Sequence, residues 1–408
     1  MGKLFVKGRV IDGTGRPPFQ GTVVIDDDKI EQVAPDGAVQ IPCDATVIDA
    51  GSGTILPGLI DAHLHLMGVR SMNPLMWVVE PLPVRVARAV RDCADLLNAG
   101  FTSVRDAGGL GVYLKRVIGE GEIPGPRIVS PNKVLSQTGG HGDVHFLPMD
   151  FVQQHGFSRI CDGVDECRKA AREQFREGAD YIKICTTGGV MSEKDKPGSS
   201  QFTVEEVAAI VEEARRVGAF VASHAQGTEG INTALRAGVK TIEHGFYINE
   251  ESIELMLKND CIMVPTLAIA HRIVTVGEKF GVPEYGIRKA REAHKAHREA
   301  VQRAKAAGVK VAMGTDFTGG PMLPFGENAM ELELFVELGF TPMEAIVSAT
   351  KIGAQAIGMG DKLGTLEAGK LADLIVVNGD PLADISCLKN PNNVRVVVKG
   401  GKVQKHLL

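Results

Sequence analysis

Two histidines stand two residues apart in an apolar stretch near the start of the chain, Leu56-Pro57-Gly58-Leu59-Ile60-Asp61-Ala62-His63-Leu64-His65-Leu66. In a β-strand, alternate side chains point to the same face, so both imidazoles can converge on one metal ion at the strand end. The same spacing also fits two hydrogen-bonded histidines on a half-buried strand. The spacing therefore makes a metal site the first hypothesis, which the rest of the chain must decide.

Further polar residues end or interrupt apolar runs later in the chain: Lys183, His224, His244 and Asp316. Lys183 could reach toward solvent, and Asp316 could cap a following helix. A buried, unpaired ammonium is unfavourable, however, so Lys183 should be neutralised, paired or chemically modified. A neutral lysine amine beside metal ions can add carbon dioxide to form a carbamate, whose two oxygens can bridge two cations.

These residues can meet only in a fold that brings the ends of several strands together, and the order of predicted strands and helices indicates such a fold. From Gly58 onward, short β-rich runs alternate with helical patterns, which is typical of a parallel sheet of βα units. We predict eight strands: Gly58–His65, Thr102–Asp106, Arg127–Pro131, Tyr181–Cys185, Phe220–His224, Thr241–His244, Cys261–Pro265 and Val309–Asp316. We predict helices at Val84–Ala99, Asp165–Glu177, Val204–Val217, Gly230–Ala237, Glu250–Lys258, Glu284–Ala307, Glu327–Leu338 and Pro342–Ile357. Eight such units over about 300 residues predict an α/β fold of the (β/α)8 TIM-barrel type.

Short strands separated by turns also occupy both ends of the chain. Neither end has enough strands to bury a core alone, so we predict one small β-sandwich built from both ends. The predicted domains are residues 1–57 and 359–408 for the two parts of the sandwich, and 58–358 for the barrel. In a TIM barrel the carboxyl ends of the strands form the active-site face, which is where the polar residues fall.

Composition narrows the possible partners. The chain has 408 residues and a formal net charge of −5, with acidic and basic residues interspersed. This distribution disfavours nucleic acid, and no stretch of about 18 apolar residues could span a membrane. The N-terminus lacks a secretory pattern, and the seven cysteines include no CxxC pair. We expect a cytoplasmic protein that forms a homo-oligomer and acts on a small molecule.

The full set of strand-end residues resembles the amidohydrolase superfamily over nearly the whole chain. Supporting motifs are Pro57-Gly58-Leu59-Ile60-Asp61 and residues 364–375, Gly-Thr-Leu-Glu-Ala-Gly-Lys-Leu-Ala-Asp-Leu-Ile. The resemblance implies two divalent cations, with zinc as the default and manganese or iron also compatible. It implies that His63, His65, Asp316 and Lys183, as N6-carboxylysine, hold one ion, and that Lys183, His224 and His244 hold the other.

The resemblance is closest to the two-metal branch related to imidazolonepropionase. It implies a prolidase-like enzyme that cleaves the peptide bond of an Xaa-Pro dipeptide by attack of a metal-bridging hydroxide, with Asp316 as general acid and base. An Xaa-Arg or Xaa-Lys dipeptidase and an N-acyl-amino-acid amidase remain alternatives. A cyclic-amide hydrolase or deaminase mostly uses one metal, which Lys183 argues against. A catalytically inactive barrel would not need to keep all six ligand positions.

Residues in the loops are the candidates for substrate contacts. His141 lies in a glycine-rich segment after the third strand, and Tyr247 follows His244 by three residues. In the relatives, the corresponding His and Tyr hold the carbonyl oxygen or the terminal carboxylate, so we assign catalysis and substrate binding to His141 and substrate binding to Tyr247.

Three other features allow a structural interpretation. Residues 186–200 form either a lid or a long surface loop. Arg105 could pair with a substrate carboxylate or with Asp106, and we do not count it as catalytic. His294 and His297 have a spacing found in metal sites, but the Lys and Arg around them favour a solvated helix face.

Overall fold

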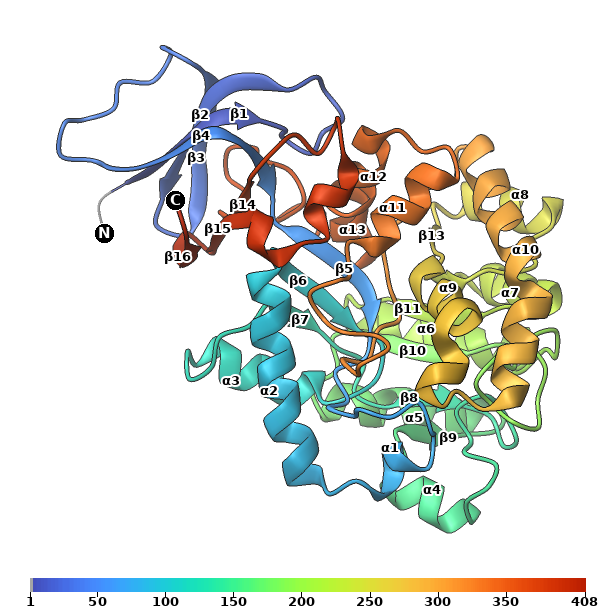
Figure 1. Cartoon of the computed structure of the whole chain (residues 1–408). Helices are drawn as coiled ribbons and strands as arrows, with labels where there is room; N and C mark the ends of the chain where they lie inside the picture. The colour runs from blue at the N-terminus through green and yellow to red at the C-terminus, as the bar shows by residue number, and fades with distance from the viewer. Residues whose placement is uncertain (1–2) are drawn as a thin grey trace.

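The computed structural model describes residues 3–408, and two bodies lie side by side in it (Figure 1). The strands are β1 Leu4–Val10, β2 Phe19–Asp26, β3 Lys29–Pro35, β4 Thr46–Pro57, β5 Leu59–Leu64, β6 Phe101–Asp106, β7 Arg127–Val129, β8 Val134–Ser136, β9 Ser158–Ile160, β10 Ile182–Cys185, β11 Val221–Ala225, β12 Thr241–His244, β13 Ile262–Val264, β14 Leu374–Val377, β15 Val394–Lys399 and β16 Lys402–His406. The α-helices are α1 Met76–Val79, α2 Leu82–Asn98, α3 Gly111–Gly119, α4 Met149–His155, α5 Val164–Arg176, α6 Val204–Arg216, α7 Thr228–Ala237, α8 Glu250–Lys258, α9 Leu267–Val276, α10 Glu284–Ala306, α11 Met330–Glu337, α12 Pro342–Ser348 and α13 Lys351–Ala356.

The first and larger body is a barrel of parallel strands with helices around it, as predicted. β5, β6 and β7 pair in parallel, and so do β8, β10, β11, β12 and β13. Residues 309–316 close the ring, because the amide of Ala62 on β5 donates to Met313 O and the amide of Ala312 donates to Met263 O, both at 2.9 Å. The strands are buried on both faces, which explains their almost continuous apolar sequences.

Two barrel strands differ from the prediction. The third is divided into β7, which pairs with β6, and β8, which pairs with β10 and carries β9 on its outer edge. The eighth, predicted at Val309–Asp316, forms only isolated bridges at Val311 and Phe317. Its regular pairing is interrupted near Asp316, where the backbone adopts a left-handed conformation with φ of 59°. Both irregular strands border the face that carries the polar residues.

The second body is built from both chain ends, as predicted. Its seven strands follow the order β16-β15-β14-β4-β1-β2-β3, so β4 from the first 60 residues pairs with β14 from the last 40. The sheet curls back on itself, since the Ile30 amide of β3 donates to Lys370 O at 2.8 Å. Apolar side chains such as Val6, Val23, Ile55 and Val376 fill the core between its faces.

The predicted helices are present, with two changes of extent. The helix predicted at Glu327–Leu338 is shorter, 330–337, and the one predicted at Pro342–Ile357 is divided at Thr350 into α12 and α13. Gly100, Gly218, Gly238 and Gly308 follow helices with positive φ, as expected for C-terminal glycines. Helices α1, α3, α4 and α9 were not predicted, because they are short or lie in the loops around the polar face.

Candidate metal centre and active site

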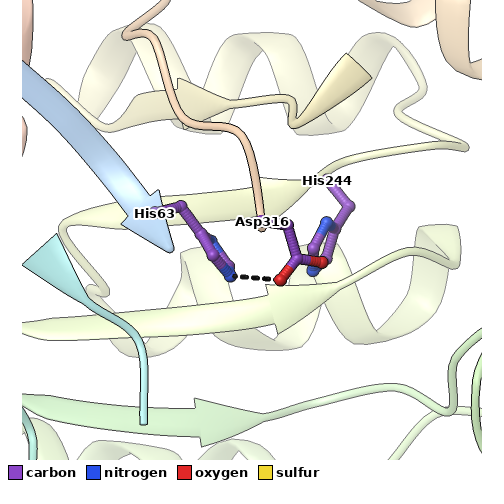
Figure 2. A group of neighbouring side chains, drawn as sticks. All are labelled: His63, His244 and Asp316. Carbon is purple, nitrogen blue, oxygen red and sulfur yellow. Dashed lines mark ion pairs between the residues drawn. The ribbon is translucent and has the colours of Figure 1, made fainter. Parts of the chain in front are cut away.

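Three of the predicted metal ligands converge at the carboxyl ends of the barrel strands. His63 ends β5, His244 ends β12 and Asp316 follows the eighth strand, and one potential ligand atom from each lies within 4.8 Å of the others. Figure 2 shows the three side chains pointing toward one another, with the ion pair between His63 and Asp316 drawn. The His63 Nε2 to Asp316 Oδ1 distance is 3.6 Å. Two imidazoles and a carboxylate at this spacing fit a divalent cation.

The other three predicted ligands line the same cavity. His65 places Nε2 3.2 Å from Asp316 Oδ1, and the His224 ring centroid lies 4.7 Å from that of His244. Lys183 lies on β10, and its Nζ is buried without a hydrogen-bond partner in the described structure. An isolated buried amine is costly to leave unpaired, and a carbamate on Nζ would supply the two oxygens that a pair of cations needs. The six residues therefore fit the metal pair that the family resemblance implies.

Each histidine has one ring nitrogen engaged by the protein, which leaves the other for a ligand bond. His63 Nδ1 contacts Glu243 Oε2 at 2.6 Å, and His65 Nδ1 contacts Gly108 O at 2.7 Å. His224 Nε2 contacts Gly188 O at 3.1 Å, and His244 Nδ1 contacts Thr266 Oγ1 at 2.7 Å. Such partners fix the ring orientation and, where the acceptor is a carbonyl or carboxylate, also the tautomer of a metal-binding histidine.

The electrostatic environment keeps His63, His224, His244, Lys183 and Asp316 in metal-binding form, whereas at His65 the hydrogen bond to Asp316 outweighs burial and raises the pKa. Burial, reinforced by nearby cations, holds the pKa of His63 well below its usual value. Burial likewise lowers the pKa values of His224, His244 and Lys183. Burial alone would raise the pKa of Asp316, but the His65 hydrogen bond and the positive charge of the cluster outweigh it, so that pKa is lowered. Neutral imidazoles beside an ionised carboxylate are the protonation states that bind a cation.

Backbone conformation at the strand ends also serves the site. His244, Thr266 and Asp316 all have left-handed backbones, with φ of 70°, 57° and 59°. Such conformations in non-glycine residues cost on the order of 1–3 kcal/mol and concentrate at functional sites. Gly314 lets the eighth strand approach β5, because a Cβ there would lie 2.8 Å from the His63 Cβ.

Two buried residues beneath the cluster were not identified from the sequence as part of the site. Glu243 accepts hydrogen bonds from His63 and, at 2.7 Å, from Arg105 Nη2. Arg105 also donates to Ala62 O at 2.5 Å and to Thr241 Oγ1 at 3.0 Å. Both proposed partners for Arg105, a substrate carboxylate and Asp106, are therefore wrong, because Arg105 is buried and pairs with Glu243. The sequence feature that could have indicated this role is the position of Glu243 directly before His244.

The two predicted substrate-binding residues, His141 and Tyr247, differ in whether they line the cavity. His141 lines the cavity, and its ring stacks on that of His224 with centroids 4.1 Å apart. Tyr247 is not among the described residues that line the cavity. Its neighbour Phe246 lines that wall and packs on His297 with ring centroids 4.3 Å apart. The phenol that lines the cavity instead belongs to Tyr285 on α10.

The histidine pair on α10 also departs from its predicted role. His294 and His297 both line the cavity, where we expected a solvated face. His297 is buried and donates from Nε2 to Pro265 O at 2.8 Å, which fixes it structurally. Burial lowers its pKa to about 3, so it stays neutral. Of the basic residues that suggested exposure, Lys295 is exposed and Arg298 is half-buried.

The rest of the cavity wall is largely apolar. Trp77, Phe146 and Phe157 come from the loops after the first and third strands, and Val190 and Met191 come from the loop after β10. That loop, residues 186–200, is tied down by Lys289, whose Nζ donates to Ser192 O and Asp195 O at 2.6 Å and to Gly189 O at 3.2 Å. It contributes to the wall of the cavity in the conformation seen.

Comparisons with known proteins agree with this architecture. Residues 54–404 match the family model described as the amidohydrolase family. The chain is 36% identical to ochratoxinase of Aspergillus niger over 420 residues, which covers 98% of this chain and 86% of that protein. A prolidase solved with N-methylphosphonate-L-proline superposes with a TM-score of 0.93 at 33% identity, covering 99% of this chain and all of that one. A Xaa-Pro dipeptidase with bound methionine gives 0.89 at 34% identity, with 99% and 100% covered.

The barrel and its cluster of strand-end ligands define a hydrolase scaffold of the TIM-barrel type. The chain belongs to the amidohydrolase family. It is a hydrolytic enzyme that acts on amide C–N bonds, which confirms the predicted class of reaction. No helix among the described residues is long and apolar enough to cross a membrane.

Proposed function

We propose that this chain is a two-metal dipeptidase of the prolidase type, which hydrolyses the amide bond before a C-terminal residue such as proline. The observation that carries the proposal is the convergence of four histidines, Asp316 and the unpartnered Lys183 amine in one cavity. The similarity to a prolidase and a Xaa-Pro dipeptidase over the whole chain supports the substrate class.

The proposed ligand assignment follows the family resemblance, and the gathering of all six residues in one cavity supports it. His63, His65 and Asp316 would hold one ion, His224 and His244 the other, and Lys183 as a carbamate both. Bound divalent cations would lower the pKa of a water molecule and polarise the substrate carbonyl. Asp316 is placed to accept the proton of that water and to deliver it to the leaving amine. His141, on the same wall, would donate a hydrogen bond to the carbonyl oxygen or to the carboxylate of the substrate.

A second candidate, an N-acyl-amino-acid amidase, is favoured by the apolar wall. Trp77, Phe146 and Phe157 offer aromatic surface to the acyl side of a substrate. The identity with ochratoxinase also supports this candidate. The two candidates share the metal cluster and the reaction, and they differ only in the group attached to the scissile carbonyl.

The test is hydrolysis of a matched library by zinc-loaded protein whose metal content is measured in the same sample. The library varies the C-terminal residue over Pro, Arg, Lys, Leu and Phe, each with a free aminoacyl or an N-benzoyl group. Two metals per chain with cleavage of Xaa-Pro establishes the prolidase-type reading, and preference for the benzoyl series establishes the amidase. One metal or none would reject the role of Lys183.

Asp316→Asn provides the mechanistic control for this assay. Loss of a general acid and base typically lowers kcat about 100- to 10,000-fold. We expect the loss in kcat to exceed any change in KM. Asp260→Asn, at an exposed ion pair with Lys310, changes the same chemical group away from the cavity and should leave the activity unchanged.

A further inference from the structure

The His141 ring is held at one face and at one edge. One face stacks on the His224 ring with an interplanar angle of 16°. Against the ring edge at Cε1 lies Gly189 of the loop after β10, where an added Cβ would stand 2.2 Å from His141 Cε1. Gly189 is therefore needed for the ring to lie where it does, and the loop and the ring are fitted to each other.

A chain of hydrogen bonds leads from this ring into the same loop. His141 Nδ1 lies 2.9 Å from Ser192 Oγ, and Ser192 Oγ makes a short hydrogen bond to Asp195 Oδ1. Asp195 is buried at its carboxylate and also accepts the Gly189 amide at 3.1 Å and Gln201 Nε2 at 3.3 Å. Gln201 Oε1 in turn accepts the backbone amide of His141 at 3.0 Å.

The direction of these bonds follows from their chemistry. A carboxylate only accepts, so the single hydroxyl proton of Ser192 is donated to Asp195. The Ser192 oxygen is then left as an acceptor, and His141 must donate to it from Nδ1. Nε2 is then the ring nitrogen that Ser192 leaves free, and it can donate to a substrate oxygen when the ring carries a second proton.

We propose that Ser192 and Asp195 are positioning residues that set the ring orientation and tautomer of His141, so that Nε2 faces the scissile bond of the bound substrate. They act as the orienting members of a histidine–serine–aspartate relay and do not touch the reacting atoms. The loop after β10 thereby has a role beyond closing the cavity wall. This inference rests on the proposed function, which makes His141 a substrate contact.

The kinetic test compares three serine variants of the zinc-loaded enzyme on its best library substrate. Ser192→Ala removes the relay, Ser192→Thr keeps the hydroxyl, and Ser199→Ala changes an exposed serine of the same loop. Loss of an orienting partner typically costs 10- to 100-fold. We expect kcat to fall about 10-fold or more in Ser192→Ala with KM changed less than about twofold, and Ser192→Thr to recover most of it. Equal kcat values for Ser192→Ala and Ser199→Ala would overturn the proposal.

A second measurement reads the tautomer without any substrate. The measurement is nitrogen-15 NMR of histidine-labelled, zinc-loaded protein, in which a His141→Gln variant assigns the His141 signals. We expect the ring proton on Nδ1 in the native chain. In Ser192→Ala, we expect this proton to be distributed over both ring nitrogens. A native ring protonated on Nε2 would contradict the relay. If the enzyme cleaves no library substrate, the proposed function fails, while this spectrum still decides the orientation of His141.

Discussion

His63 and Glu243 form a fully buried pair in which Nδ1 lies 2.6 Å from Oε2, and this contact turns His63 Nε2 toward Asp316. In the proposed metal site, the glutamate would therefore act on the ion through the opposite nitrogen of the ring. Glu243 directly precedes His244, so β12 carries the proposed ligand His244 and also the residue that orients the proposed ligand His63.

Glu243→Gln should weaken metal binding. The amide cannot serve as a charged acceptor for His63, and removal of such a partner typically lowers metal affinity 10- to 100-fold. Zinc affinity is measured by competition with a chromophoric chelator. Glu333→Gln, at a partly exposed ion pair with Lys389, serves as the matched control. An unchanged affinity in Glu243→Gln would show that Glu243 does not orient His63.

Arg105→Met should destabilise the fold without a specific effect on substrate binding. The substitution leaves Glu243 buried without its cation, which typically costs about 3–5 kcal/mol. Arg105→Lys should recover little, because a lysine cannot reproduce the separate bonds to Ala62 O, Thr241 Oγ1 and Glu243. Thermal unfolding measures the effect. A variant with native stability and a raised KM would instead return Arg105 to the substrate site.

Lys289→Met should loosen the loop of residues 186–200. The ammonium donates to three carbonyls of the loop, and its removal leaves them without that donor. Hydrogen–deuterium exchange of the loop peptides should speed up about 10-fold or more, which corresponds to roughly 1.4 kcal/mol of lost protection. Lys295→Met, an exposed position on the same helix, should exchange like the native chain. Unchanged exchange in Lys289→Met would mean that other contacts hold the loop.

Arg168 and Arg172 of α5 pair with Glu213 of α6, and these ion pairs should make the free energy of unfolding depend on pH in the acid range. The Arg172 hydrogen bonds, with Arg168, lower the pKa of Glu213 to about 2, below its usual 4.5. A depressed pKa contributes stability that is present above about pH 4.5 and is lost as the pH falls toward 2. Glu213→Gln should lower the free energy of unfolding by about 1 kcal/mol at pH 7 and by much less near pH 2. Denaturant unfolding at both pH values tests this, and an equal loss at both would contradict it.

The barrel and the positions of the proposed ligands could be predicted from the sequence because these polar residues end or interrupt apolar runs. His63, His224 and His244 could be assigned in this way, since a parallel barrel brings strand ends together whatever the loops do. The partners behind them could not be assigned. Arg105 and Glu243 lie 138 positions apart in the chain, and their pairing depends on which faces of β6 and β12 meet inside the barrel.

The contacts made by the loop of residues 186–200 could not be predicted from the sequence for a related reason. Ser192 contacts His141 from a loop whose backbone is bonded by Lys289, almost 100 residues later in the chain. Similarly, the charges around His294 predicted an exposed helix face, but α10 packs over the cavity and buries that side. Periodicity reports that a helix is amphipathic and does not report what covers it.

The seven-stranded sheet has a consequence for how the protein is made. β4 pairs with β14, so β4 is synthesised before the barrel and its partner strand only after it. During that interval the edge of β4 and apolar side chains such as Ile55 are uncovered, a condition that favours aggregation. Premature termination before β14 would leave a chain with all eight barrel segments and an unprotected sheet edge. The sheet beside β4 therefore stays incomplete until β14 and β15 have been made.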